Sequence, residues 1–203
     1  MNRDILSHDE AAESLEAIRS VLDRATRYTH VTWAGVFLVG LVGVLASGFG
    51  WVCQLSPSES PEGFLYLWCG ALLTALSLGF CATAQKARRA REPVLSRKLL
   101  LVSVGLFPSF VVAGLLTVLF ADAGTLEFAP GAWMALYGLG ILGVGHLLDW
   151  EFQLTGWGFL VASAAALFLL RASPHASMLV SFGGIHLGLG FFRYYKERTW
   201  QPK

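Results

Sequence analysis

Two histidines lie inside apolar stretches of the sequence and are the first candidates for chemistry. His146 stands three residues before Asp149, so the two side chains would share one face of a helix. A carboxylate in that position can hold an imidazole in a single tautomer, as carboxylates do for metal-bound histidines. His186 lies near the middle of the last apolar stretch, among glycines. Because an ionisable group is costly to desolvate at membrane depth, all three residues are candidate ligand or cofactor residues.

Three hypotheses follow for His146 and His186. The two side chains could bind haem b or a metal ion of unspecified kind. They could line a substrate or proton path. In the third hypothesis each neutral imidazole forms a hydrogen bond across a helix interface, and the GxxxG pair Gly184 and Gly188 allows close approach. We favour this structural interpretation, because two histidines without a characteristic spacing do not identify a metal site, and no cofactor is predicted.

The composition predicts an all-α protein that crosses a membrane several times. Of the 203 residues, 55% are hydrophobic and 14% are charged, and the mean hydropathy is +0.57. A soluble domain of this size has too small an interior for so many apolar side chains. The net charge of +1 provides no basic surface for nucleic acid. The motifs G-x-S-x-G, the P-loop and H-E-x-x-H do not occur, so the sequence gives no sign of an enzyme.

Six apolar segments are long enough to cross a bilayer core, which takes about 17–25 residues of helix, or close to that length. They are residues 32–52, 64–84, 99–120, 132–148, 154–170 and 178–192. We expect Pro108 to bend the third of them. Together they predict a six-helix transmembrane bundle over residues 32–193, preceded by a segment of residues 1–31 and followed by a tail of residues 194–203.

The positions of the positive charges support six spans and orient them. Lys and Arg collect in short cytoplasmic loops. If both termini are cytoplasmic, every Lys and Arg except Arg171 falls on the cytoplasmic side. Tryptophans lie at the ends of the predicted spans, where amphipathic rings prefer the membrane–water interface. We therefore predict a multi-pass protein of the inner (cytoplasmic) membrane, with its N- and C-termini in the cytoplasm.

Residues 1–31 are predicted to form a separate cytoplasmic amphipathic helix. Ser7 and Glu10 fit a capping box at its start. An apolar stripe then recurs at alternating steps of four and three residues, and it includes Leu15, Ile18, Leu22 and Ala25. Such a helix can lie on the membrane surface, or it can dock a cytoplasmic protein partner or a second copy of the chain.

A basic cluster occupies the second predicted inner loop and consists of Lys86, Arg88, Arg89 and Arg91. Clusters of this size beside a membrane span can bind anionic lipid headgroups, or they can serve only to fix the topology. Both interpretations stay open.

The three cysteines form no CxxC motif and no Cys/His cluster, which makes a zinc or dithiol site unexpected. Cys53 and Cys69 could approach each other on the outer side of the membrane. The sequence does not decide whether they pair.

Three stretches of the chain resemble small bacterial six-helix integral membrane proteins that have no assigned activity. The stretches are residues 16–30 ahead of the glycine-rich first span, YGLG at 137–140, and FGGIH at 182–186. The resemblance implies a bacterial inner membrane and carries no catalytic residues. Relatives of this kind are sometimes encoded beside winged-helix regulators, which implies a role in signalling.

The leading prediction is a non-enzymatic membrane protein that binds a protein partner or a small ligand, in a regulatory or scaffold role. It would contact membrane lipids and could form a homo-oligomer. The alternative is a small transporter or channel, and the second alternative is a haem or metal protein using His146 and His186. A transporter needs a polar path, for which the spans offer hydroxyls that can equally bond to their own helices: Ser47, Thr74, Ser77, Ser103, Ser109, Thr117, Ser163 and Ser181.

Overall fold

The chain folds into helices joined by short connections. The computed structural model describes residues 12–17, 31–91, 93–170 and 173–199, and no strand occurs in these ranges. The predicted all-α class is therefore confirmed. The main elements are α2 (Trp33–Val52), α3 (Pro61–Arg89), α4 (Arg97–Asp122), α5 (Ala129–Val144), α6 (Trp150–Phe168), α7 (Pro174–Met178), the π-helix η3 (Leu179–Ile185) and α8 (His186–Thr199).

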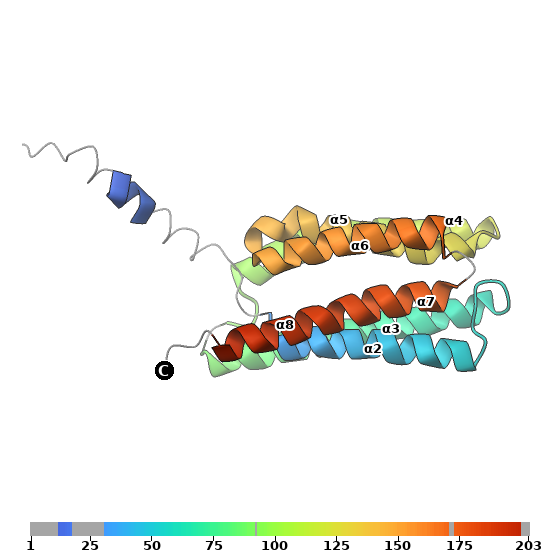
Figure 1. Ribbon diagram of the computed structural model, residues 1–203, viewed down its shortest axis with the longest axis horizontal. Coiled ribbons are helices and arrows are strands. Elements are labelled where there is room, and N and C mark those ends of the chain that lie inside the picture. The colour runs from blue at the N-terminus through green and yellow to red at the C-terminus, as the bar shows by residue number, and fades with distance from the viewer. Residues whose placement is uncertain (1–11, 18–30, 92, 171–172, 200–203) are drawn as a thin grey trace, which may run out of the picture.

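The helices form two layers of three (Figure 1). In one layer α5 lies between α4 and α6, and in the other α2 lies between α3 and α8. The π-helix η3 packs on α2 and also contacts α6, while α7 contacts α2, α5 and α6. The chain thus crosses from one layer to the other twice, between α3 and α4 and between α6 and α7.

Within the described residues, five helical stretches are long and apolar enough to cross a membrane. They are Trp33–Val52, Pro61–Arg89, Arg97–Asp122, Leu126–Leu147 and Pro174–Thr199. The remaining helix, α6, has 19 residues, but its first turn contains Glu151 and Gln153, which lower its hydropathy. Five of the six predicted spans therefore meet the requirements of length and composition.

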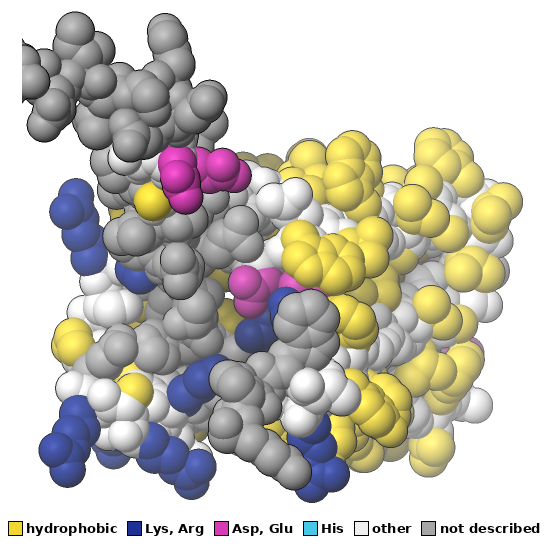
Figure 2. Space-filling view, turned by 60° about the vertical axis from the view of Figure 1, so that its left-hand side comes forward, with side chains coloured by type: hydrophobic (Ala, Val, Ile, Leu, Met, Phe, Trp, Pro, Cys, Tyr) yellow, Lys and Arg dark blue, Asp and Glu magenta, His cyan; other side chains and the backbone are white. Residues whose placement is uncertain are grey.

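Large apolar side chains are exposed along the outer helices. The structure describes all of α4, and Val102 is its one buried residue. Leu115 and Val118 of this helix are 66% and 69% exposed. Figure 2 shows hydrophobic side chains gathered over one half of the surface, while Lys and Arg gather over the other. Such an apolar exterior suits contact with lipid chains rather than water.

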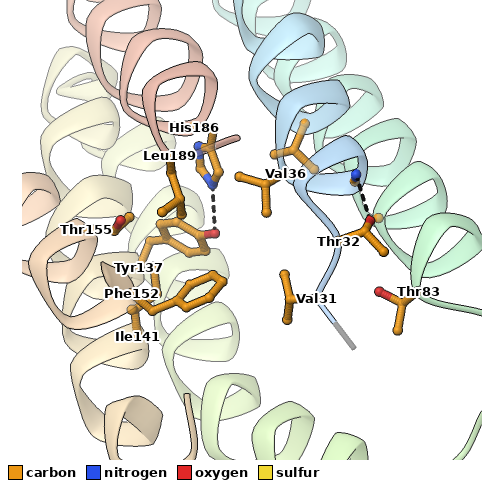
Figure 3. Close-up of a pocket in the computed structure, with 13 residues that line it drawn as sticks. Val31, Thr32, Val36, Thr83, Tyr137, Ile141, Phe152, Thr155, His186 and Leu189 are labelled. Atoms are coloured by element: carbon orange, nitrogen blue, oxygen red, sulfur yellow. Dashed lines mark hydrogen bonds between the residues drawn. The ribbon is translucent and has the colours of Figure 1, made fainter. Parts of the chain in front are cut away.

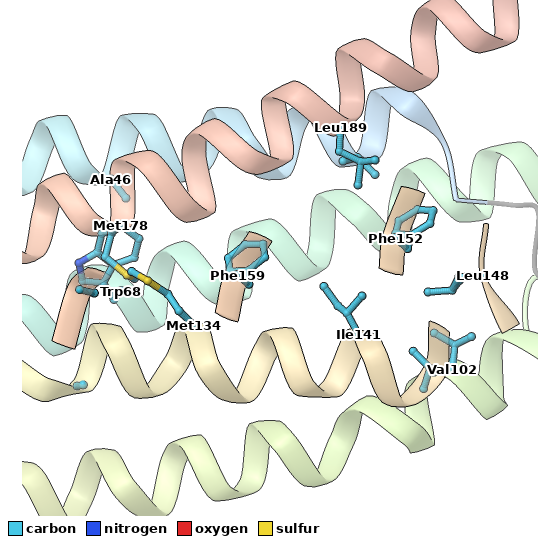
Figure 4. Packing of buried hydrophobic residues seen from close by; sticks show 14 of the residues in the cluster. Ala46, Trp68, Val102, Met134, Ile141, Leu148, Phe152, Phe159, Met178 and Leu189 are labelled. Atoms are coloured by element: carbon cyan, nitrogen blue, oxygen red, sulfur yellow. The ribbon is translucent and has the colours of Figure 1, made fainter. Parts of the chain in front are cut away.

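Apolar side chains fill the space between the two layers. Phe64 of α3 is fully buried and stacks on Trp133 of α5, with ring centroids 5.9 Å apart. Nearer the middle of the bundle, Phe159 of α6 is fully buried and contacts Phe182 of η3 at 5.0 Å. Figure 4 shows Phe159 as part of a row of buried side chains that runs along the bundle, from Trp68 and Met134 to Phe152 and Leu148. The layers are therefore held together over most of their length.

Glycines bring α2 against η3 and α8, although not the glycines that the sequence suggested. A Cβ atom at Gly43 would lie 2.8 Å from the backbone nitrogen of Gly183, and one at Gly190 would lie 2.8 Å from that of Phe37. Gly184 and Gly188 are exposed, and nothing lies within 4 Å of a Cβ at Gly188. The predicted packing role of the GxxxG pair is wrong within this chain, because these two glycines face away from α2.

Several predicted boundaries are corrected by the structure. Lys86, Arg88 and Arg89 lie in the last turn of α3 rather than in a loop, where positive charge suits the C-terminal end of the helix dipole. His175, which falls between the predicted spans 154–170 and 178–192, is buried in α7. The helix α4 continues through Pro108.

The predicted N-terminal helix is described only over residues 12–17, which are helical and exposed. Leu15 is 67% exposed. Ile18, Leu22 and Ala25 of the predicted apolar stripe, and the capping pair Ser7 and Glu10, lie outside the described residues.

Replacement of Gly43 by alanine tests the glycine contact between α2 and η3. The added methyl group would meet backbone atoms of Phe182 and Gly183, so we expect Gly43→Ala to lower the free energy of unfolding in detergent by ~1–3 kcal/mol. Gly188→Ala is the control, because its methyl group would point into open space, and its effect should stay within about 0.5 kcal/mol. Equal losses in both variants would contradict this packing.

Candidate functional site

A hydrogen bond joins Tyr137 of α5 to His186 of α8 in the middle of the bundle. The Tyr137 hydroxyl lies 3.0 Å from His186 Nε2, and His186 Nδ1 lies 3.0 Å from the carbonyl oxygen of Phe182. A carbonyl oxygen can only accept, so Nδ1 carries the proton and Nε2 accepts the hydrogen of Tyr137. His186 is buried and no carboxylate lines the cavity beside it, so the imidazole is neutral, because a charged ring there would have no counter-charge. Both ring nitrogens are then satisfied, and the hydroxyl of Tyr137 donates its one hydrogen to His186.

The π-helix η3 explains why the Phe182 carbonyl accepts from a side chain. In an α-helix this carbonyl would accept the backbone N–H of His186, four residues on. Here the His186 N–H donates to Gly183 instead. The carbonyl of Phe182 therefore accepts Nδ1 of His186 and fixes the orientation of the imidazole. Short π segments are frequent at functional sites because they re-aim side chains in this way.

A cavity of about 190 Å³ lies beside this pair, between the two helix layers. Figure 3 shows Tyr137 and Phe152 on one side of it and Val31, Thr32 and Thr83 on the other. Its lining contains no Asp, Glu, Lys or Arg. The lining residues are Val31, Thr32, Gly35, Val36, Val39, Gly79, Thr83, Tyr137, Ile141, Phe152, Thr155, His186 and Leu189.

Three threonines line the cavity, and the hydroxyl of one of them, Thr83, is bonded differently from the other two. Thr155 donates to the carbonyl of Glu151 on its own helix, and the Thr32 oxygen accepts the backbone N–H of Gly35 as the cap of α2. Thr83 of α3 makes no hydrogen bond to any described residue. Figure 3 shows its hydroxyl on the side that faces Val31. A helical threonine normally satisfies its hydroxyl on a carbonyl of the preceding turn, so the free hydroxyl of Thr83 is available to a ligand.

A cluster of buried charges lies at one end of the cavity. Arg193 Nη1 donates to Asp149 Oδ2 at 3.0 Å and to Glu151 Oε1 at 2.8 Å. Lys196 Nζ donates to the same Glu151 oxygen at 3.0 Å. The side chains of Arg193 and Glu151 are only 7% and 3% exposed. Two positive and two negative groups thus neutralise one another. We call Asp149, Glu151, Arg193 and Lys196 the charge cluster.

The charge cluster touches the wall of the cavity at two points. Arg193 Nη2 donates to the backbone oxygen of Val31 at 3.0 Å, and its guanidinium lies over the ring of Phe152 at 5.1 Å. Val31 and Phe152 both line the cavity. Because α6 and α8 belong to different layers, Arg193 also ties the two layers together at this end.

The structure does not bring the three predicted ligand residues together. His186 is buried, His146 is exposed in the short 3-10 turn after α5, and no hydrogen bond or ring contact joins the two among the described residues. The carboxylate of Asp149, which we expected to orient His146, accepts a hydrogen bond from Arg193. In the described ranges no group of three or more His, Cys, Asp or Glu side chains is arranged to hold a metal ion.

Sequence reasoning missed Tyr137, Glu151 and Arg193 as site residues. Arg193 was counted only among the charges on the cytoplasmic side, and Glu151 falls between two predicted spans. Because Asp149 and Gln153 flank Glu151 closely, its sequence position gives no sign that it is buried and needs a partner. Nothing in a single sequence indicates that the partner lies on α8.

The predicted basic cluster and the cysteines contribute no residue to the lining of the cavity. Lys86 forms an ion pair with Glu197 of α8 at 3.6 Å, while Arg88, Arg89 and Arg91 are exposed. The predicted binding of anionic lipid by this cluster stays a prediction. The described cysteines Cys53, Cys69 and Cys81 are all free thiols and exposed.

Most of the span hydroxyls bond to their own helices. In five of them the hydroxyl donates to the backbone carbonyl four residues earlier in the same helix. These five are Ser47, Thr74, Ser77, Thr117 and Ser181. Ser163 donates instead across the α5–α6 interface, to Gly131 at 2.8 Å. These hydroxyls are therefore occupied and do not form a polar path across the bundle.

The cavity offers three kinds of contact to a ligand. They are an apolar wall, the oxygen of Tyr137 and the hydroxyl of Thr83. The letters GxGxxG do occur at 138–143, but they lie within α5 and follow no strand, so they form no dinucleotide turn. No family model, curated protein or solved structure matches the chain.

A double-mutant cycle on Tyr137 and His186 tests the hydrogen bond between them. Tyr137→Phe keeps the ring but leaves the buried Nε2 unpaired, so we expect a loss of ~1–3 kcal/mol in the free energy of unfolding. Tyr66→Phe is the control, because Tyr66 is 76% exposed. In the double variant Tyr137→Phe/His186→Leu the unpaired acceptor is gone, and the loss should be smaller than the sum of the single losses. Strictly additive losses would show that the two side chains are not coupled.

Proposed function

We propose that the protein is a non-enzymatic integral protein of the bacterial inner membrane that binds a small ligand between its two helix layers and signals occupancy to a cytoplasmic partner. The observation that carries the proposal is the cavity beside Tyr137 and His186. Cavities between the helices of a bundle, apolar with a few convergent polar groups, are typical small-ligand sites. The N-terminal segment is the part proposed to contact the partner.

Six spans with both termini in the cytoplasm are part of the proposal. The difficulty is α6, which begins with Glu151. Its charge is neutralised by Arg193 and Lys196 of α8, so α6 can enter the bilayer without an unpaired charge. Its 19 residues extend about 28 Å at 1.5 Å per residue, close to the thickness of the bilayer core. The ends of α3 and α8 and the start of α4 place Lys and Arg at the same end of the bundle, as the positive-inside rule requires.

Val31 provides a physical route from the cavity to the N-terminal segment. It is the residue at which residues 1–30 join the bundle, its side chain lines the cavity, and its carbonyl is held by Arg193. A ligand that displaces Val31 or Phe152 would disturb the contacts of Arg193. By linkage, the state of the N-terminal segment would in turn change the affinity for the ligand.

One observation also favours a carrier as a second candidate. The cavity lies between two layers that are joined by the charge cluster at one end and by Phe64 and Trp133 towards the other. A carrier needs two such closures that open alternately. Flux of a cavity ligand into proteoliposomes would favour the carrier, whereas binding without flux would favour the regulatory role.

A cavity-filling variant tests ligand binding. A side chain at Gly79 enters the cavity, where a Cβ would meet only Val39 at 3.8 Å, whereas a side chain at Gly70 on the same helix points into open space. In a thermal-stability screen of small uncharged compounds, we expect at least one to stabilise the wild type and Gly70→Leu but not Gly79→Leu, because binding to the folded state raises stability. A screen in which no compound distinguishes the two leucine variants would count against a ligand in this cavity.

A further inference from the structure

We infer that the ligand is an uncharged, single-ring compound with hydrogen-bonding groups at two opposite edges, one of which donates to the oxygen of Tyr137 while the other meets the hydroxyl of Thr83. This inference rests on the proposed function and specifies the chemistry of its ligand. Its support comes from the volume, the charge and the polar groups of the cavity.

The volume limits the ligand to a small molecule. A cavity of 150 Å³ in another protein holds benzene, and the cavity here measures about 190 Å³. The difference leaves room for one or two substituents on a ring. Drug-sized ligands occupy cavities of at least about 300 Å³. The cavity is open on one side, so its volume limits the part of the ligand that lies between the helices, and that part is no larger than a substituted single ring.

The charges around the cavity exclude an ionised ligand. No charged side chain lines it. The charge of the nearest guanidinium, that of Arg193, is balanced by Asp149 and Glu151, and its Nη2 donates to the Val31 carbonyl, while its buried Nε has no partner among the described residues. An ionised carboxylate or ammonium in the cavity would lose its hydration without gaining an opposite charge. The ligand is therefore neutral.

The hydrogen bond to His186 determines what Tyr137 can offer. Nδ1 of His186 donates to the Phe182 carbonyl, so Nε2 takes the hydrogen of the Tyr137 hydroxyl. The oxygen of Tyr137 then presents only lone pairs towards the cavity. A ligand group that satisfies it must be a donor, such as a hydroxyl or an N–H. A carbonyl or ether oxygen in that place would form no hydrogen bond, because its lone pairs would face the lone pairs of the Tyr137 oxygen.

Thr83 supplies the second polar contact. Its hydroxyl has no partner among the described residues and can donate or accept. It belongs to α3 in one layer, whereas Tyr137 belongs to α5 in the other, and Figure 3 shows the two on opposite sides of the cavity. The rings of Tyr137 and Phe152 form one wall. A flat ring with polar groups at opposite edges matches this distribution.

Hydroquinone, p-cresol and p-xylene provide the test, because they have nearly the same shape and carry two, one and no hydroxyls. Affinities are measured for the full chain in nanodiscs, from the chemical shift of the Ile141 methyl group. Hydroquinone is kept reduced. The same titration of Gly79→Leu, whose cavity is filled, gives the signal from compound that has only partitioned into lipid, and this signal is subtracted. We expect the ratio of hydroquinone to p-cresol affinity to fall about tenfold in Thr83→Val and in Tyr137→Phe/His186→Leu, since each removes one hydrogen bond to the ligand. The double variant is needed because Tyr137→Phe alone would leave Nε2 of His186 free to accept the hydroxyl of the ligand. Thr83→Ser, which keeps the hydroxyl, should preserve the ratio.

An unchanged ratio in Thr83→Val and in Tyr137→Phe/His186→Leu would overturn the inference and leave the proposed function intact. Failure of all three rings to bind would also overturn it, and the proposed function would stand if another compound still depended on position 79. If no compound of this series binds and no compound in the screen depends on position 79, both the inference and the proposed function are overturned.

Discussion

The burial of Arg193 against Glu151 is the constraint on which the arrangement of the bundle depends. A buried charge without a partner is far more costly than any single packing contact. Arg193 must therefore lie level with the first turn of α6 and within reach of Asp149 and the Val31 carbonyl. This requirement brings Arg193 of α8 opposite the first turn of α6 across the two layers, and it holds the backbone just before α2. It also allows α6 to carry an acidic residue into an otherwise apolar bundle.

The position of His186 follows from how α8 is held on the opposite side. Gly43 and Gly183 bring α2 and η3 to backbone contact, which holds η3 against α2. The Phe182 carbonyl is left for the imidazole, and the imidazole orients Tyr137. Between this hydrogen-bonded chain and α3 the side chains are small or short, among them Gly35, Gly79 and Thr83, and the cavity remains. The site is thus a consequence of two different helix contacts, one ionic and one made by glycines.

Sequence reasoning predicted the helical elements better than their contacts. Composition and the length of apolar segments predict helices such as Trp33–Val52 and Arg97–Asp122, because these properties are local. The importance of His186 was also visible, since an ionisable group in an apolar stretch needs a partner. Its partner Tyr137, the pairing of Asp149 with Arg193 rather than with His146, and the packing of Gly43 rather than Gly188 all depend on which helices are neighbours. A single sequence contains no signal for that choice.

A double-mutant cycle between Glu151 and Arg193 tests most directly whether the charge cluster holds the layers together. Glu151→Gln and Arg193→Met each leave a buried charge without its main partner, so each should reduce the free energy of unfolding by about 3–5 kcal/mol. In the double variant Asp149 and Lys196 still balance one another, and the loss should fall well short of the sum of the single losses. Small single losses that simply add would contradict the dependence of the bundle on this cluster.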